Sequence, residues 1–124
     1  MASMDVLVGL VAEKIITDAE GIIIQFKSGE KLDMRHDQDW GEDVYLEEII
    51  GDLQDLVGSA IVSAYKSSSS TTSEYGDVEQ WTFYRFVTEK GPVTLRWIGT
   101  SNGYYSTEVE ATFYPVNGKE LKLK

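Results

Sequence analysis

The chain contains no cysteine, only one histidine and few basic residues. Without cysteine it forms neither a disulfide nor a thiolate-bound zinc site, which fits a reducing compartment. Lys and Arg number 11 against 21 Asp and Glu, a formal net charge of −10, so binding of duplex nucleic acid through phosphate neutralisation is disfavoured. No apolar run reaches the roughly 18 residues of a membrane span. These absences predict a partner that is neither duplex nucleic acid nor a membrane.

The length of 124 residues predicts a single domain, 1–124, with a modest core of its own. Residues 1–4 are interpreted as a cloning remnant. Residues 66–77, KSSSSTTSEYGD, predict a flexible Ser-rich loop, because such a composition buries too little surface to order itself. Residues 115–124 are expected to be a loose tail or an edge strand.

Alternating and β-branched residues predict an antiparallel meander in the first third of the chain. Its strands are expected at 11–18, 21–27 and 30–36, with the first turn at Ala19-Glu20-Gly21. A second meander is expected from Glu79 onward.

Two turn signals divide the second meander into hairpins. Lys90-Gly91 separates two aromatic-rich runs, and Asn102-Gly103 follows the second of them. Asn-Gly is a strong signal for a two-residue hairpin because both positions then adopt positive φ.

Between the meanders, the apolar residues have helical spacing. They are Ile49, Ile50, Leu53, Leu56 and Val57. Gly51 interrupts the pattern, Asp52 suits an N-cap and Gly58 suits a C-terminus, so we expect one broken helix or two short ones. The predicted fold class is therefore α+β: an antiparallel sheet of two meanders with one short or broken helix packed on it.

Two of the three arginines face each other in this arrangement. With Lys90-Gly91 as the loop, Arg85 lies directly opposite Arg96 on one face of the sheet. Like charges so opposed are destabilising, and an anion is expected between them. It is either an internal carboxylate, such as Asp37 or Glu42, or a ligand phosphate gripped by the guanidinium groups. The pattern leaves both open.

The same register gives both faces of the sheet an aromatic surface. Phe83 shares a face with the two arginines, and Trp97 takes the other face. One face is expected to pack on the helix, and the other to meet a second sheet, a partner chain or a planar ligand. Homo-oligomerisation is therefore expected.

Polar and aromatic residues follow in the Asn-Gly turn. Asn102, Tyr104 and Tyr105 are candidates for bonding and stacking a ligand. Arg96 lies six residues before Asn102, about 20 Å away in an extended strand. A ligand that touches both is long, or a second subunit brings the tyrosines to the arginines.

No catalytic motif is evident in the sequence. His36, Asp37 and Asp39 could offer weak ligands to Mg²⁺ or Mn²⁺, but the more ordinary role of a lone histidine is to end a strand. There is no Gly-rich phosphate loop, nucleophile elbow or H-E-x-x-H motif. We therefore expect a non-enzymatic protein with no metal site and no cofactor.

A longer pattern suggests a family. HDQD, VYLEEI and GDLQDLVG are followed, after the polar loop, by WTFY, TEKG, RW and SNGYYS. Over roughly residues 20–110 this resembles a family of small uncharacterised bacteriophage proteins. Trp40 and Gly41 depart from it, standing where cysteines or small residues are expected.

That family in turn resembles the phage sponge proteins that counter the Thoeris defence, which bind cyclic ADP-ribose signals, and in some cases cyclic oligonucleotides, without cleaving them. The resemblance implies an anti-defence protein that sequesters such a nucleotide in the host bacterial cytoplasm as a homo-oligomer. It would use Arg85 and Arg96 for phosphate, Tyr104, Tyr105 or Trp97 for the base, and Asn102 for the ribose or base edge, with Phe83 beside them. The alternatives are an acidic inhibitor that docks a host protein through residues 33–56, and a metal-dependent nucleotide hydrolase.

Overall fold

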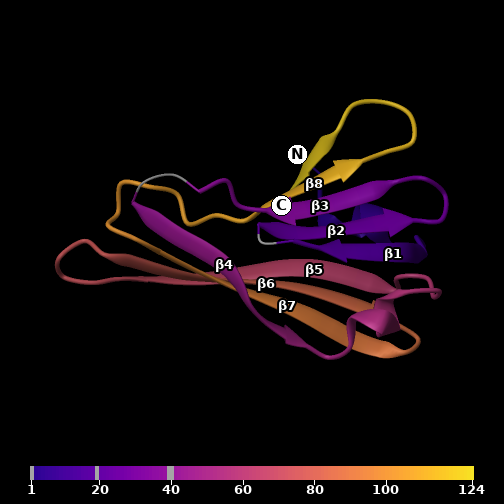
Figure 1. Ribbon diagram of the computed structural model, residues 1–124, viewed down its shortest axis with the longest axis horizontal. Coiled ribbons are helices and arrows are strands. Elements are labelled where there is room, and N and C mark those ends of the chain that lie inside the picture. The colour runs from indigo at the N-terminus through magenta and orange to yellow at the C-terminus, as the bar shows by residue number, and fades with distance from the viewer. Residues whose placement is uncertain (1, 19, 39–40) are drawn as a thin grey trace.

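Two antiparallel β-sheets form the protein in a computed structural model, which describes residues 2–18, 20–38 and 41–124 (Figure 1). The five-stranded sheet has the order β1-β2-β3-β8-β9, with bounds Ala12–Thr17, Gly21–Phe26, Lys31–Arg35, Glu110–Tyr114 and Leu121–Leu123. The four-stranded sheet has the order β4-β7-β6-β5, with bounds Glu42–Ile50, Gly91–Ser101, Val78–Thr88 and Ser63–Thr72. The other regular elements among the described residues are two short 3₁₀ turns, η1 at Met4–Leu7 and η2 at Leu53–Leu56.

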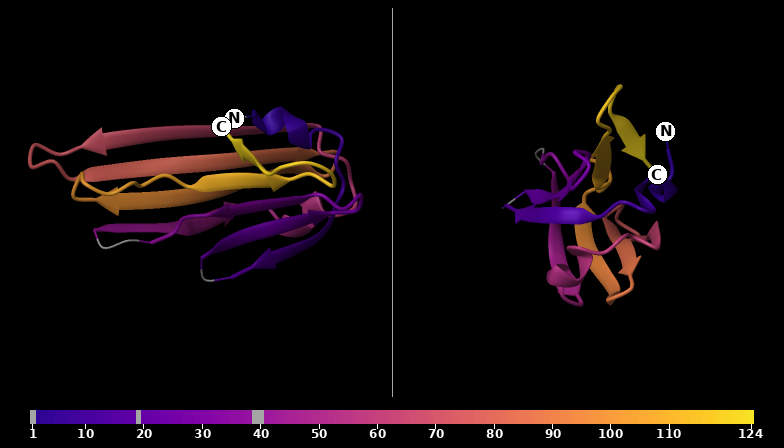
Figure 2. Two further views of the ribbon diagram at one scale, coloured as in Figure 1. Left: turned by 90° about the horizontal axis from the view of Figure 1, so that it is seen from above. Right: turned by 90° about the vertical axis from the view of Figure 1, so that its right-hand side faces the viewer.

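The core lies between the two sheets, which pack face to face (Figure 2). Strand residues alternate between faces, so every second side chain of β2, β3, β6 and β7 is buried. The largest fully buried side chains come from both sheets: Trp97, Tyr84, Phe86, Leu95, Ile22, Ile24, Leu32 and Met34. One face of each sheet is therefore used for stability, and the outer face of each remains available.

Tyr84 ties the sheets together through a polar contact inside this core. Its hydroxyl donates to the carbonyl oxygen of Val109 at 3.1 Å. Burial raises the pKa of Tyr84, and the nearby Glu108 and Glu110 carboxylates add to the effect. The tyrosine is thus held protonated as a donor.

The predicted first meander is confirmed, but the α+β class is wrong. The expected helix is the end of strand β4 followed by the 3₁₀ turn η2, and the described residues contain no α-helix. The reason is that the apolar pattern spans two elements. Ile49 and Ile50 end β4, Leu53 and Leu56 are the first and last residues of the four-residue η2, and Val57 is its C-cap. A spacing of three residues also fits one 3₁₀ turn, so it does not require an α-helix. No described helix is long and apolar enough to cross a membrane.

The predicted Ser-rich loop is also wrong over most of its length. Strand β5 continues through Thr72 and pairs with β6, and only residues 73–77 form the turn. The serines gain their order from backbone hydrogen bonds to β6, which composition does not reveal. The β5–β6 hairpin extends past the end of the five-stranded sheet (Figures 1 and 2). The C-terminal segment does supply an edge strand, β9.

The turns of the second meander differ from those predicted. Thr88 pairs with Gly91, so the loop is Glu89-Lys90, and Gly91 has φ +120°. A loop at Lys90-Gly91 would put a lysine at positive φ, which this arrangement avoids. Asn102-Gly103 closes no hairpin: β7 leaves its sheet there and the chain enters β8 of the other sheet.

Asp18 stabilises the turn between β1 and β2. Its Oδ1 accepts from the backbone N–H groups of Glu20 and Gly21, both at 2.8 Å. These hydrogen bonds, and next to them the charge of Arg35, lower the pKa of Asp18. Ala19, part of the predicted turn, lies outside the described residues.

Replacing Asp18 by Asn is expected to destabilise the protein at neutral pH but not in strong acid. A lowered folded pKa means that the carboxylate stabilises the fold above the unfolded value of about 3.8, and that this contribution is lost as the pH falls through the folded pKa. Urea midpoints of both proteins across this pH range measure it. A constant difference at all pH values would contradict the role of the charge.

Candidate functional site

The outer face of the four-stranded sheet carries most of the solvent-facing aromatic residues of its strands. We call it the open face. Its side chains lie in rows across β4, β7, β6 and β5, because opposed residues of paired strands point the same way. One row is Ile50–Thr94–Arg85–Tyr65, the next Glu48–Arg96–Phe83–Ser67, and the third Tyr45–Ile98–Trp81–Ser69.

Arg96 is held within the protein by two carboxylates. Its Nη2 lies 2.8 Å from Glu47 Oε1 and 2.7 Å from Glu48 Oε2. Its guanidinium carbon lies 5.4 Å from the ring centroid of Trp81. The predicted internal anion is therefore present for Arg96, but it comes from the bulge of β4 and not from Asp37 or Glu42. Arg96 fixes one side of Trp81, and its charge is already neutralised.

Arg85 does not face Arg96. Arg85 pairs with Thr94, and Arg96 pairs with Phe83, so the predicted opposition is wrong by two residues. The two guanidinium groups remain on the same face as diagonal neighbours. The error follows directly from the turn, whose loop is Glu89-Lys90.

Arg85 has no carboxylate partner among the described residues. Its opposite neighbours are Tyr65 and Thr94, and the diagonal positions on the adjoining strands hold Ser63, Ser67, Pro92 and Arg96. The side chain is half-buried. By contrast, Arg35 contacts three carboxylates. In so acidic a chain, a half-buried arginine without an anion is unusual and indicates a place for one.

Trp97 is not part of a ligand surface. It is 1% exposed and faces the core from β7. Its Nε1 is buried without a hydrogen-bond partner among the described atoms. The predicted stacking role of Trp97 is thus wrong, although the prediction that it lies on the face opposite Arg96 is right.

Asn102, Tyr104 and Tyr105 lie in the crossover after β7, apart from the arginines. Asn102 Oδ1 accepts from the backbone N–H of Tyr104 at 3.1 Å, and Tyr104 is 89% exposed. Tyr105 is half-buried, and a Cβ at Gly41 would overlap its ring. Glu79 of β6 pairs with Thr100 of β7, directly before this crossover, and lies six residues from Arg85 along β6. The crossover residues are therefore about 20 Å from Arg85.

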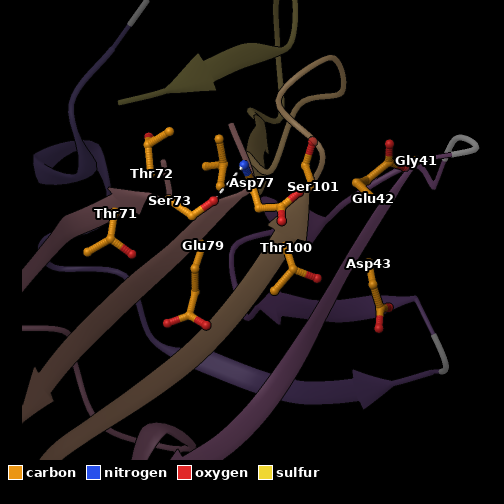
Figure 3. Close-up of a pocket in the computed structure, with 11 residues that line it drawn as sticks. Gly41, Glu42, Asp43, Thr71, Thr72, Ser73, Asp77, Glu79, Thr100 and Ser101 are labelled. Carbon is orange, nitrogen blue, oxygen red and sulfur yellow. Dashed lines mark hydrogen bonds between the residues drawn. The ribbon is translucent and has the colours of Figure 1, made fainter. Parts of the chain in front are cut away.

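A groove of about 670 Å³ lies at this end of the sheet. Figure 3 shows its lining from all four strands, with Asp43, Thr100, Glu79 and Thr71 forming one row. The described residues that line it are rich in hydroxyl and acidic groups and include no lysine or arginine. A phosphate is disfavoured there, so the groove does not complete the predicted nucleotide site.

His36 directly follows β3 and is a buried structural residue. Its Nδ1 lies 2.6 Å from the carbonyl oxygen of Glu108, and its Nε2 lies 3.4 Å from Glu42 Oε1. A carbonyl only accepts, so Nδ1 carries a proton. Within the described residues no group of three or more His, Asp or Glu side chains could hold a metal ion. Asp39 and Trp40 lie outside those residues.

The sequence prediction missed three aromatic residues of the open face. Trp81 is half-buried, and Tyr45 and Tyr65 are 47% and 48% exposed. Strand alternation already placed Trp81 beside Arg85 and could have identified it. Tyr45 could not be found in this way, because its segment was expected to be helical. Tyr65 directly precedes the predicted loop at residues 66–77, so no predicted register placed it beside Arg85.

Fold and site together define an all-β, two-sheet protein whose four-stranded sheet presents aromatic residues and two arginines on its outer face. The chain belongs to the family described as a domain of unknown function, DUF7448, whose family model matches residues 5–111. No curated protein and no solved structure matches the chain.

Proposed function

We propose that the protein binds a nucleotide on the open face and sequesters it without cleaving it. The observation that carries this proposal is Arg85, a half-buried guanidinium without a carboxylate partner in the described parts of the chain. A phosphate group satisfies such a fork through bidentate hydrogen bonds. Basic residues are sparse elsewhere, so this position is the most favourable one for an anion on the open face.

Aromatic rings beside Arg85 support a nucleotide over a bare phosphate. Phe83 lies two residues away on the same strand and Trp81 four away, both on the open face. Bases stack on such rings with little preference for sequence. Tyr65, directly opposite Arg85, adds an exposed ring on the other side. The phosphate of a nucleotide could therefore bind Arg85 while its base stacks on one of the neighbouring rings.

The finer proposal is a phage-encoded sponge. The ligand would be a cyclic ADP-ribose isomer or a cyclic oligonucleotide that signals infection, and its capture in the host bacterial cytoplasm would block the defence response. The sequence motifs support this assignment. Asn102, Tyr104 and Tyr105 would take part only through a long ligand or a second copy, because they lie about 20 Å from Arg85.

The acidic inhibitor finds less support in the structure. Several acids of residues 33–56 already have internal roles. Glu47 and Glu48 hold Arg96, Asp33 bonds Arg35 and the Asp52 side chain caps η2. Fewer acids are then free for a basic partner than the sequence count indicates.

Thermal shift against a panel of nucleotides tests the proposal. We expect a cyclic ADP-ribose isomer or a cyclic dinucleotide to stabilise the protein by about 2.7 kcal/mol at a hundredfold excess over Kd, roughly 10 °C for a domain of this size. Arg85→Gln should abolish the shift. Lys14→Gln, the same charge loss at an exposed position of β1, should keep it.

Two results would count against this function. A shift that survives in Arg85→Gln would exclude Arg85 as the phosphate partner. The second is cleavage of the nucleotide, detected by chromatography after incubation with the protein and denaturation. A sponge returns the nucleotide intact, so a cleaved product would indicate hydrolysis.

A further inference from the structure

The four outermost strands of the two sheets differ in how they are protected. An outermost strand presents unpaired N–H and C=O groups that pair readily with another chain, and proteins block this with charges, bulges or short strands. In the five-stranded sheet, β1 carries Glu13 and Lys14 and has a bulge between Ala12 and Lys14. At the other side, β9 has only three residues, one of them Lys122, and Leu123 bridges to Ala2.

The four-stranded sheet has one protected and one unprotected edge. On β4, Glu42, Asp43, Glu47 and Glu48 accompany the bulge. On β5 the register with β6 is continuous over ten residues, without a bulge or a proline. From residue 67 to 73 the sequence is SSSSTTS, without a charge. Thus β5 has one charged residue, Lys66, and its stretch from Ser67 to Thr72 lacks every device that protects the other three edges.

Nothing in the described chain covers the outer edge of this Ser-rich half. The 3₁₀ turn η1 contacts β5, and the neighbouring backbone bonds join Gly9 and Leu10 to Ile61, before the strand begins. Residues 66–72 are exposed apart from a half-buried Lys66. In Figure 2 the hairpin that carries them projects beyond the rest of the molecule. Its backbone groups are available to another strand.

We propose that a second copy of this chain pairs with β5 antiparallel across a two-fold axis, joining the two four-stranded sheets into one. The sequence of the edge, not the net charge, favours a second copy. Two molecules of net charge −10 repel each other overall, but residues 67–73 carry no charge, so an antiparallel pairing of this stretch with itself opposes no like charges.

Self-pairing also matches the side chains. With the two-fold axis at Ser69, Ser68 lies opposite the partner's Ser70, and Ser67 opposite the partner's Thr71. Hydroxyl pairs of this kind stabilise neighbouring strands. Both open faces then lie on the same side of the joined sheet. The pairing of β5 does not depend on nucleotide binding. The dimer proposal can therefore be wrong while the binding proposal is right, and the reverse also holds.

Charge variants at Ser68 and Ser70 test the pairing. Both residues pair with inward-facing positions of β6, Thr82 and Gln80, so they lie on the sheet face away from Arg85. We expect the wild-type mass by sedimentation to rise with concentration toward twice 13.9 kDa. Ser68→Lys with Ser70→Lys should stay at the single-chain mass, and so should Ser68→Glu with Ser70→Glu. An equimolar mixture of the two variants should restore the double mass.

The lysine and glutamate variants carry opposite charges. Lysines lower the net negative charge and glutamates raise it, so loss of the dimer in both variants would indicate repulsion at the β5 edge and not an effect of net charge. Ser28→Lys with Asn117→Lys, at exposed turn positions between strands of the other sheet, is the matched control and should dimerise like the wild type. A wild-type chain that stays at the single-chain mass, or paired variants that dimerise normally, would overturn the proposal. In the first case β5 is open to a strand from a different protein.

Discussion

Trp97→Ala is expected to lower the free energy of unfolding by about 3–5 kcal/mol, the usual cost of removing a fully buried large aromatic side chain. Trp97 is 1% exposed and lies in the core with Leu95 and Val93 of the same strand. Its removal leaves a cavity between the sheets. Urea unfolding followed by far-UV circular dichroism measures the change.

The matched control is the same substitution on the other face of the same sheet. Trp81 is half-buried on the open face, so Trp81→Ala should cost much less stability. If Trp97→Ala leaves too little folded protein, Trp97→Phe keeps most of the volume and should still fold with reduced stability. A Trp97→Phe protein that folds normally but loses nucleotide binding would contradict the assignment of Trp97 to the core.

The first meander and the β6–β7 hairpin could be predicted from local signals, and the register of that hairpin could not. Alternation correctly sorted Trp97 from Phe83 and Arg96, because a shift of two residues keeps every side chain on its face. The same shift changed which residues lie opposite. Lys90-Gly91 and Glu89-Lys90 are adjacent solutions of one turn. Gly91 can adopt positive φ in both, and the observed loop avoids positive φ at Lys90.

The end of β4 shows why the predicted fold class was wrong. Ile49 and Ile50 end the strand, whereas Leu53 and Leu56 belong to the 3₁₀ turn η2. Together they imitate the spacing of an α-helix, although they come from two different elements. Strand β5 shows the complementary error, because its serines are ordered by β6, a partner chosen by the whole topology and not by local composition.

The candidate site was predictable only where it depended on alternation. Phe83, Arg85 and Arg96 were placed on one face correctly. The carboxylates that neutralise Arg96 come from the bulge of β4, so the difference between a satisfied and an unsatisfied arginine became visible only in the folded sheet. Arg96 is neutralised by these carboxylates and lies against Trp81, whereas Arg85 is the proposed partner of a phosphate.

Trp81→Ala is expected to weaken nucleotide binding by roughly 5- to 150-fold, because stacking of a base on an aromatic ring contributes about 1–3 kcal/mol. Arg96 lies against one side of Trp81, 5.4 Å from the ring centroid, and holds the ring in place for a base on its free side. Titration calorimetry with the nucleotide that gives the largest thermal shift measures the change in Kd.

Tyr104→Ala decides between the two groups of predicted ligand residues. Tyr104 is 89% exposed in the crossover loop, so its removal should leave stability unchanged. If the ligand is held by the open face of a single copy, Tyr104→Ala keeps the wild-type Kd while Trp81→Ala raises it. If both substitutions raise Kd, the ligand spans the roughly 20 Å between the groups or meets a second copy. If only Tyr104→Ala raises it, the open face is not the binding site, and the loop beside the acidic groove takes its place.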